Sequence, residues 1–376
     1  MQFMGYRRED GRVGVRNYVL ILPGCACASE TCRLVASEVR GTKNVIMNVG
    51  CSDVQANTDM NLRVLTGFAL NPNVFGVIVI GLGCETVGHR ELAAKIRAET
   101  SKPVVSFGIQ EIGGTVATTA AAVKAAREMV AQASEQQREP CDASDLFVAI
   151  ECGGSDATSG IASNPAVGNM SDRIVDLGGT TMMSETIEFV GAEHILAKRG
   201  ATPEIHDQII RICEDYEKHL AGVGQDCRTG QPTTGNKAGG LSTIEEKSLG
   251  CIHKGGTRPV VEVLQEAARP TKKGALIMDT PGDDISSVTS MGAVFTTGRG
   301  TPTGHALAPV IKVTGNRETA KRMADNMDID VSGILEGDLT IADAGKGILD
   351  EVIRVASGKV TKAEAFGFSD IAVDHI

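Results

Sequence analysis

The sequence predicts an α/β protein made of two consecutive Rossmann-like domains, each with three layers around a parallel sheet. Apolar runs typical of buried strands alternate with stretches of helical periodicity along both halves of the 376-residue chain. Strands joined by helices in this way form right-handed parallel units. The polar segment 135–145 contains Pro140, which indicates a boundary between domains 1–140 and 141–376.

The first half begins with a basic, glycine-punctuated arm over residues 7–17. An apolar run follows at once and predicts the first buried strand. The alanine-rich stretch at the end of this half has apolar residues at helical spacing. The predicted strands are 18–22, 44–49, 74–80 and 104–109, and the predicted helices include one ending at Leu70, 88–100 and 113–137.

The second half repeats the alternation of strands and helices. Residues 221–250 interrupt it, because they are rich in Gly, Thr and Lys and show little periodicity. We expect a long active-site loop over 221–256. The predicted strands are 146–150, 179–183, 275–278, 293–295 and 310–313, and the predicted helices are 164–177, 204–220, 316–326 and 343–356.

Composition excludes several classes of function. A net charge of −10, no tryptophan and three tyrosines argue against a nucleic-acid-binding surface. We see neither a signal peptide nor a run of 18 apolar residues, so no membrane segment is expected and the predicted location is cytoplasmic. The ten cysteines should then be reduced.

The stretch 151–196 is the strongest candidate for a site. An apolar run ends at Glu151-Cys152-Gly-Gly-Ser155, which places polar groups at the carboxyl edge of a sheet, where ligands bind in open α/β folds. Glu185 and Glu188 stand three residues apart among apolar neighbours. They form either a solvated acidic face or a buried pair, and a buried pair requires a metal, a cation or a raised pKa.

Three glycine-flanked cysteines, Cys51, Cys84 and Cys152, follow predicted strands. Thiols at corresponding edges of a parallel sheet can converge on one metal or cluster. The alternative is that each cysteine fills a tight turn.

Two further segments carry cations among glycines and hydroxyls. The loop 234–256 contains Lys247 and Lys254, and a lysine can bind a carboxylate or serve as a base when its pKa is lowered. Arg299, in the segment 295–305, suits a bidentate clamp on a carboxylate or phosphate. No G-x-G-x-x-G or P-loop pattern supports nucleotide binding. A solvated mobile loop is the alternative for 234–256.

Together these motifs resemble the altronate/galactarate dehydratase family, which also contains the large subunit of (2R)-sulfolactate sulfo-lyase. The resemblance covers nearly the whole chain. The segments that carry it are 10–17, 81–85, 152–156 with 164–165, 184–193, 235–240, 246–250 and 295–302.

The resemblance implies a lyase dependent on Fe(II), or on another divalent cation, that acts on a hydroxylated carboxylic acid. The expected activity is dehydration of a sugar acid such as altronate to a 2-keto-3-deoxy acid. The alternatives are sulfite release from (2R)-sulfolactate and, in another class, non-catalytic binding of a small acid. The expected site residues are Lys247, Glu185 and His194 for catalysis, Arg299, Lys254, Asn236, Lys237, Thr297 and Ser155 for the substrate, and Cys84, Cys152, Cys51 and Glu188 for the metal.

Two features differ from the family pattern. Many sugar-acid dehydratases carry an N-terminal β-rich domain, whereas this sequence starts directly at the D-G-R-x-G segment. Some members have a histidine shortly before the Gly-Cys pair, where this chain reads Asn48-Val-Gly-Cys51. We therefore expect a separate small β-rich subunit within an oligomer. The basic arm with Arg7, Arg8, Arg12 and Arg16 is expected to be its docking element, and the alternative is that the arm packs on its own first strand.

Overall fold

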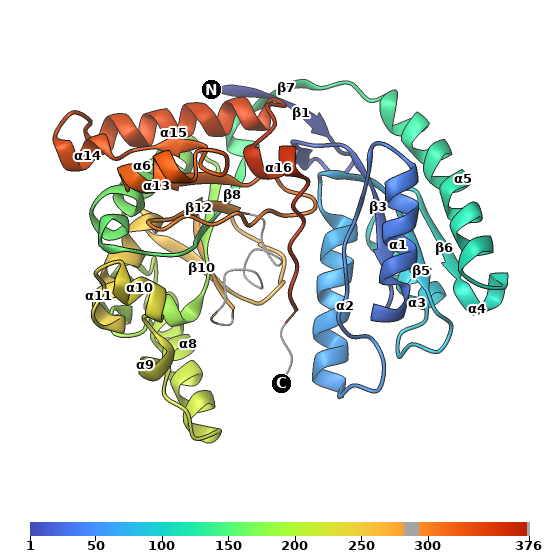
Figure 1. Ribbon diagram of the computed structural model, residues 1–376, viewed down its shortest axis with the longest axis horizontal. Helices are drawn as coiled ribbons and strands as arrows, with labels where there is room; N and C mark the ends of the chain where they lie inside the picture. Colours follow the sequence, from blue (N-terminus) through green and yellow to red (C-terminus); the bar gives the residue numbers. More distant parts are fainter. Residues whose placement is uncertain (281, 283–292, 374–376) are drawn as a thin grey trace.

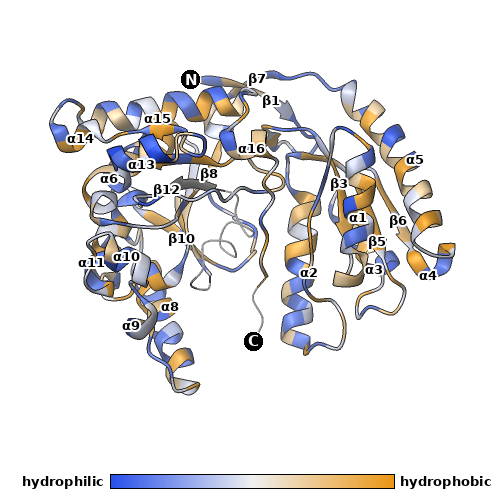
Figure 2. Ribbon diagram, viewed as in Figure 1, coloured by the Kyte–Doolittle hydropathy of each residue, from blue (hydrophilic) through white to orange (hydrophobic). Residues whose placement is uncertain are grey.

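The computed structural model describes residues 1–280, 282 and 293–373. It contains two parallel sheets flanked by helices, one in each half of the chain (Figure 1). The predicted α/β fold class is confirmed. Along helices such as α15 (Ile341–Ala356), hydrophobic and hydrophilic residues alternate (Figure 2), as expected for helices that cover a sheet.

The N-terminal sheet has four parallel strands in the order β4-β3-β5-β6. Its central strands carry continuous apolar sequence and are almost entirely buried, as parallel strands covered on both faces should be. Helices α1 and α5 pack on one face, and α2 and α3 pack on the other. The bounds are β3 Tyr18–Pro23, α1 Ala26–Glu38, β4 Thr42–Asn44, α2 Gln55–Leu70, β5 Val74–Gly81, α3 His89–Glu99, β6 Val104–Gly108, α4 Ile109–Ile112 and α5 Thr115–Ser134.

The C-terminal sheet has seven parallel strands in the order β10-β11-β9-β8-β12-β13-β14. Helices α6 and α15 cover one face, and α8 lies with the core of the other. The bounds are β8 Phe147–Cys152, α6 Asn164–Asp176, β9 Thr180–Met183, α7 Glu193–Leu196, α8 Pro203–Gly222, β10 Val260–Gln265, β11 Ala275–Asp279, β12 Ala293–Thr296, β13 Ile311–Thr314, α13 Arg317–Arg322, β14 Ile329–Asp330, α14 Gly333–Glu336 and α16 Lys362–Phe366.

Both ends of the chain cross between the two sheets. A small antiparallel sheet, β2-β1-β7, lies above them (Figure 1) and is formed by Val13–Gly14, Gln2–Arg7 and Glu139–Asp142. Its Phe3 packs in the core of the C-terminal sheet. In the opposite direction, Leu307 and Val373 pack in the core of the N-terminal sheet. These crossings fix the two sheets relative to one another.

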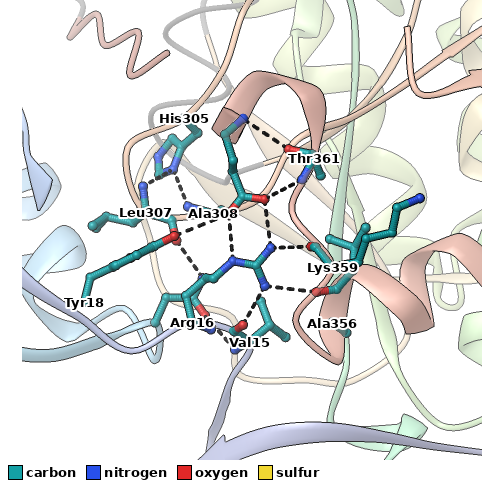
Figure 3. Close-up of polar contacts among 12 residues, drawn as sticks. Val15, Arg16, Tyr18, His305, Leu307, Ala308, Ala356, Lys359 and Thr361 are labelled. Carbon is teal, nitrogen blue, oxygen red and sulfur yellow. Dashed lines mark hydrogen bonds and ion pairs between the residues drawn. The ribbon is translucent and has the colours of Figure 1, made fainter. Parts of the chain in front are cut away.

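The basic arm takes part in this connection through Arg16. Arg16 is buried, and its guanidinium donates to both carboxylate oxygens of Glu364, at 2.7 and 2.8 Å, and to the carbonyl of Val355 (Figure 3). Arg8 donates to the carbonyl of Pro72, and the remaining two arginines pair with acidic side chains of the same chain. Arg8 and Arg16 are thus used within the chain, whereas the side chains of Arg7 and Arg12 remain partly exposed. That the arm docks a partner stays a prediction.

The structure differs from several local predictions. The strand expected over 44–49 ends at Asn44, because the backbone of Met47 bonds with the hydroxyl of Ser29 instead of a neighbouring strand. The predicted loop 221–256 contains the short helices α9 (Cys227–Gly230), α10 (Thr234–Ala238) and α11 (Ile244–Cys251), each with a side-chain cap. Strand β10 was not predicted.

Among the described helices, none combines the length and apolar character that a membrane span requires.

Candidate active site

A buried cluster of carboxylates lies at the carboxyl ends of two neighbouring strands. Glu151 and Cys152 end β8, and Glu185 follows β9. The chain then forms a short 3₁₀ turn, Thr186–Glu188, which brings Glu188 to the same place. One ligand atom of each of these four side chains lies within 4.8 Å of the others, and all four residues are buried.

Two buried lysines complete this buried cluster. Lys247 is on α11, and Lys254 is in the turn Ile252–Gly255 that follows it. The Nζ atom of Lys254 contacts one carboxylate oxygen of Glu188 and lies 3.9 Å from Glu151. The Nζ atom of Lys247 lies 3.3 Å from the other oxygen of Glu188. Because buried charges must be paired, these contacts allow the carboxylates to remain in the core.

Two thiols and a hydroxyl donate to the carboxylates. The Cys251 thiol donates to Glu188 at 3.0 Å, and the Cys152 thiol donates to Glu185 at 3.3 Å. The Ser184 hydroxyl donates to Glu151. Glu151, Ser184 and Cys251 were not predicted as site residues. For Cys251 a signal was present, because it stands four residues after Lys247, on the same face of a helix.

Glu185 has a backbone conformation that non-glycine residues rarely adopt, with φ 66° and ψ 74°. Its N–H donates to the hydroxyl of Thr280 at 2.7 Å. Such conformations cost on the order of 1–3 kcal/mol and cluster at functional sites. The strain is consistent with a side chain that must be aimed at a specific point.

The electrostatics separate the three carboxylates. Burial acts to raise the pKa of Glu188, but Lys254 and Lys247 outweigh it and hold the pKa below its ordinary value. Burial, reinforced by Glu188, raises the pKa of Glu185 well above its usual range. Burial also raises the pKa of Glu151. Glu188 is thus held as an anion, whereas Glu185 is the carboxyl group whose environment favours binding of a proton.

The lysines remain cationic. Burial acts to lower the pKa of Lys247 and of Lys254, yet the Glu188 carboxylate outweighs it and holds each pKa well above its ordinary value. A general base needs a pKa near the working pH. Lys247 in this arrangement is therefore better suited to supply positive charge than to accept a proton.

The donor set fits a divalent transition metal. Carboxylate oxygens suit hard ions, and a single thiol shifts the preference away from Mg²⁺ and Ca²⁺ towards ions such as Fe(II) or Zn²⁺. Burial is the main cause that raises the pKa of the Cys152 thiol well above its usual range, and the negative charge of Glu185 raises it further. A bound ion would displace this proton, because metal-bound thiols are deprotonated.

The remaining expected substrate residues lie around the loops after β8 and β12. The N–H of Arg299 donates to the carbonyl of Gly154 at 2.7 Å, and its side chain is exposed. Thr297 donates to the same carbonyl. Asn236 caps α10 and donates to the carbonyl of Ser155 at 2.9 Å. Thr297 and Asn236 thus hold the loops in place, and the Arg299 side chain is exposed beside them.

Other predicted residues lie elsewhere. His194, on α7, and Lys237, on α10, are exposed and outside the buried cluster. Cys51 and Cys84 follow β4 and β5 of the N-terminal sheet, whereas Cys152 ends β8 of the other sheet. Of the four residues expected to bind metal, the structure brings together Cys152 and Glu188.

Comparison with known proteins gives matches along the whole chain. The family model for "D-galactarate/Altronate dehydratase, C-terminal" matches residues 143–376. The model for "D-galactarate dehydratase/Altronate hydrolase, second domain" matches residues 5–134.

Three curated relatives show the range of named activities. The (2R)-sulfolactate sulfo-lyase subunit beta of Chromohalobacter salexigens is 39% identical, over 100% of this chain and 97% of the relative. The galactarate dehydratase (L-threo-forming) of Escherichia coli is 36% identical, over 95% of this chain and 73% of the relative. The altronate dehydratase of Bacillus subtilis is 33% identical, over 99% of this chain and 77% of the relative.

Proposed function

The chain belongs to the D-galactarate/altronate dehydratase family, and we propose that it is a lyase acting on a 2-hydroxycarboxylic acid. It would remove the proton on C2 and release a substituent from C3. The relatives are sugar-acid dehydratases and a sulfolactate sulfo-lyase, and both activities follow this course. The observation that carries the proposal is a buried group in which three glutamates at the ends of β8 and β9 meet two lysines from α11 and the turn after it.

We assign the base to Glu185. A proton next to a carboxylate is weakly acidic, so its removal needs a base with a raised pKa in a site that excludes water. Glu185 has the raised pKa, the burial and the strained backbone. The ammonium groups of Lys247 and Lys254 would stabilise the negative charge that develops on the substrate carboxylate as the proton leaves.

Arg299 is proposed to hold the substrate carboxylate. Its backbone is bonded to the loop that follows Cys152, and its side chain is exposed at that point. A guanidinium forms two parallel hydrogen bonds with a carboxylate and so fixes both distance and orientation. Orientation of this kind contributes directly to rate, because the proton on C2 must face the base.

Glu151, Cys152 and Glu188 are proposed to hold one divalent ion, with Fe(II) the first candidate. When bound, such an ion acts as a Lewis acid on the substrate oxygens. The proton on C2 still passes to the Glu185 carboxylate, and the electron pair of the C2–H bond forms the double bond to C3. The leaving group departs from C3 with its bonding electrons, and the resulting enol becomes a 2-keto acid.

Two leaving groups remain candidates. Hydroxide, protonated to water, leaves when the substrate is a sugar acid such as altronate or galactarate. Sulfite leaves when the substrate is (2R)-sulfolactate, and the product is pyruvate. The 39% identity over nearly all of both chains favours the second substrate. The same relative is named a subunit, so we also propose that this chain works with a separate small subunit in an oligomer.

A product assay tests the proposal. The chain is loaded anaerobically with Fe(II), alone and with a co-purified small partner, and offered altronate, galactarate and sulfolactate. We expect one of the three acids to yield a 2-keto acid and a chelator to abolish turnover. Binding of an acid without any product would favour the non-catalytic alternative, and full turnover in metal-free protein would exclude the metal role.

A further inference from the structure

The two chain segments that leave β9 and β11 at their carboxyl ends are bound to one another. These strands are parallel neighbours, and their ladder pairs Ala275–Ile277 with Thr181–Met183. Glu185 stands two residues after β9, and Thr280 directly follows β11. Both residues are buried. The residue assigned as the base thus lies beside the end of β11.

Three hydrogen bonds join the two segments. The N–H of Glu185 donates to the hydroxyl of Thr280 at 2.7 Å. The N–H of Thr186 donates to the carbonyl of Thr280 at 3.2 Å, and the Thr186 hydroxyl donates to the Asp279 carboxylate at 2.5 Å. A side-chain hydroxyl therefore accepts from Glu185, where a continued parallel ladder would offer a backbone carbonyl. This exchange lets the backbone turn out of the sheet at Glu185.

The conformation of Glu185 depends on being held. Its φ of 66° and ψ of 74° lie in the left-handed region, where the Cβ of any residue other than glycine is crowded. A strained backbone of this kind persists only when the surrounding structure fixes it. Without the Thr280 hydroxyl, the buried N–H of Glu185 would lose this partner. A relaxed backbone would then point the Glu185 side chain in another direction.

We propose that Thr280 is a positioning residue for Glu185. Its hydroxyl holds the backbone in the left-handed turn that aims the Glu185 carboxyl group at the proton on C2. The inference rests on the proposed function, in which Glu185 is the base. A misplacement of about 1 Å in a reacting group can cost about 10²-fold in rate. Because the hydroxyl holds the backbone of the base, its loss should slow proton removal and leave substrate and metal binding unchanged.

The test compares Thr280→Val with Thr280→Ser in the full chain loaded anaerobically with Fe(II). Valine keeps the shape of threonine without the hydroxyl, whereas serine keeps the hydroxyl. Whichever of altronate, galactarate and sulfolactate gives product is used, both unlabelled and deuterated at C2. For Thr280→Val we expect kcat to fall about 10²-fold, with unchanged KM and bound iron and a larger deuterium isotope effect on kcat. Thr280→Ser should behave like the wild type.

Thr181→Val is the matched control. It removes another buried hydroxyl, from β9 itself, that accepts from the Ser171 hydroxyl at 2.8 Å, and it should leave kcat unchanged. A wild-type kcat and isotope effect in Thr280→Val would overturn the proposal. An equal loss in Thr280→Ser or in Thr181→Val would do the same, since the Thr280 hydroxyl would then not be the cause.

Two further variants keep the result interpretable. If Thr280→Val does not fold, Thr280→Ala removes the same hydroxyl without adding a methyl group, and the same outcomes apply to it. Glu185→Gln separates this inference from the proposed function. A wild-type rate in Glu185→Gln would overturn the base assignment and the role of Thr280 with it. An inactive Glu185→Gln beside a fully active Thr280→Val would overturn the role of Thr280 alone.

Discussion

The two parallel sheets each bury a glutamate near the carboxyl ends of their strands, yet they satisfy its charge differently. In the N-terminal sheet, Glu85 accepts hydrogen bonds from the backbone N–H groups of Gly83 and His89. In the C-terminal sheet, Glu188 is held by two buried lysines and a thiol. Backbone amides fix a loop, whereas side-chain cations can also stabilise negative charge that develops on a substrate. Both glutamates are buried, so burial alone does not distinguish the proposed active site in the C-terminal sheet from the N-terminal sheet. The groups that compensate the carboxylate charge do.

The largest expected effect tests this difference directly. Glu188→Gln leaves Lys247 and Lys254 buried with reduced compensation, because it removes the carboxylate that both lysines contact. We expect turnover to fall to background and the free energy of unfolding to drop by about 3–5 kcal/mol. Glu85→Gln, the matched variant in the other sheet, should cost about 1–3 kcal/mol. Urea unfolding measures both, and equal losses would remove the distinction between the two edges.

A smaller effect is expected at the contact that joins the two halves. Burial acts to raise the pKa of Glu364, but Arg16 outweighs it and keeps the pKa below its ordinary value. Because the folded-state pKa is lowered, the pair stabilises the fold at neutral pH, and this contribution disappears as pH falls below about 4.5 towards the folded-state pKa.

Glu364→Gln should therefore lose about 3 kcal/mol at pH 7, and its deficit relative to wild type should shrink on acidification below pH ~4.5. Unfolding midpoints over a pH series provide the measurement. The exposed pair of Arg7 and Glu139 offers the control, since Glu139→Gln should cost at most about 1 kcal/mol. A deficit for Glu364→Gln that stays constant with pH would contradict the electrostatic account.

The smallest effect concerns Arg299. Arg299→Lys keeps the charge and loses the planar fork of the guanidinium. The activation free energy should therefore rise by about 1.5–3 kcal/mol, the range for charge-assisted hydrogen bonds, and kcat/KM should fall accordingly. Arg317→Lys, at an exposed arginine paired with Glu336, is the control and should leave kcat/KM unchanged. A near wild-type Arg299→Lys enzyme would place the carboxylate clamp elsewhere.

The sequence predicted most of the fold because buried parallel strands leave a clear apolar pattern. β3 and β5 were recognised in this way, whereas β10 was not, since only two of its six residues are fully buried. The helices of 227–251 were also missed, because each is held by a cap and by tertiary contacts rather than by an apolar stripe.

The candidate site was predicted in part. Glu185, Glu188 and Cys152 were named because they stand among apolar residues or at a strand end. The sequence does not show which strands are neighbours, so it could not separate Cys51 and Cys84 from Cys152. Nor could it show that Lys247 faces Glu188, and that contact determines whether the lysine is a base or a permanent cation.

The most direct test of the central claim compares wild type with Glu185→Gln, both loaded anaerobically with Fe(II). Bound iron is measured together with the initial rate of 2-keto acid formation from the best of the three acids. We predict equal iron and a rate reduced by about 10²–10⁴-fold, the usual contribution of a general base. A Glu185→Gln enzyme with equal iron and a wild-type rate would contradict the assignment of Glu185 as the base.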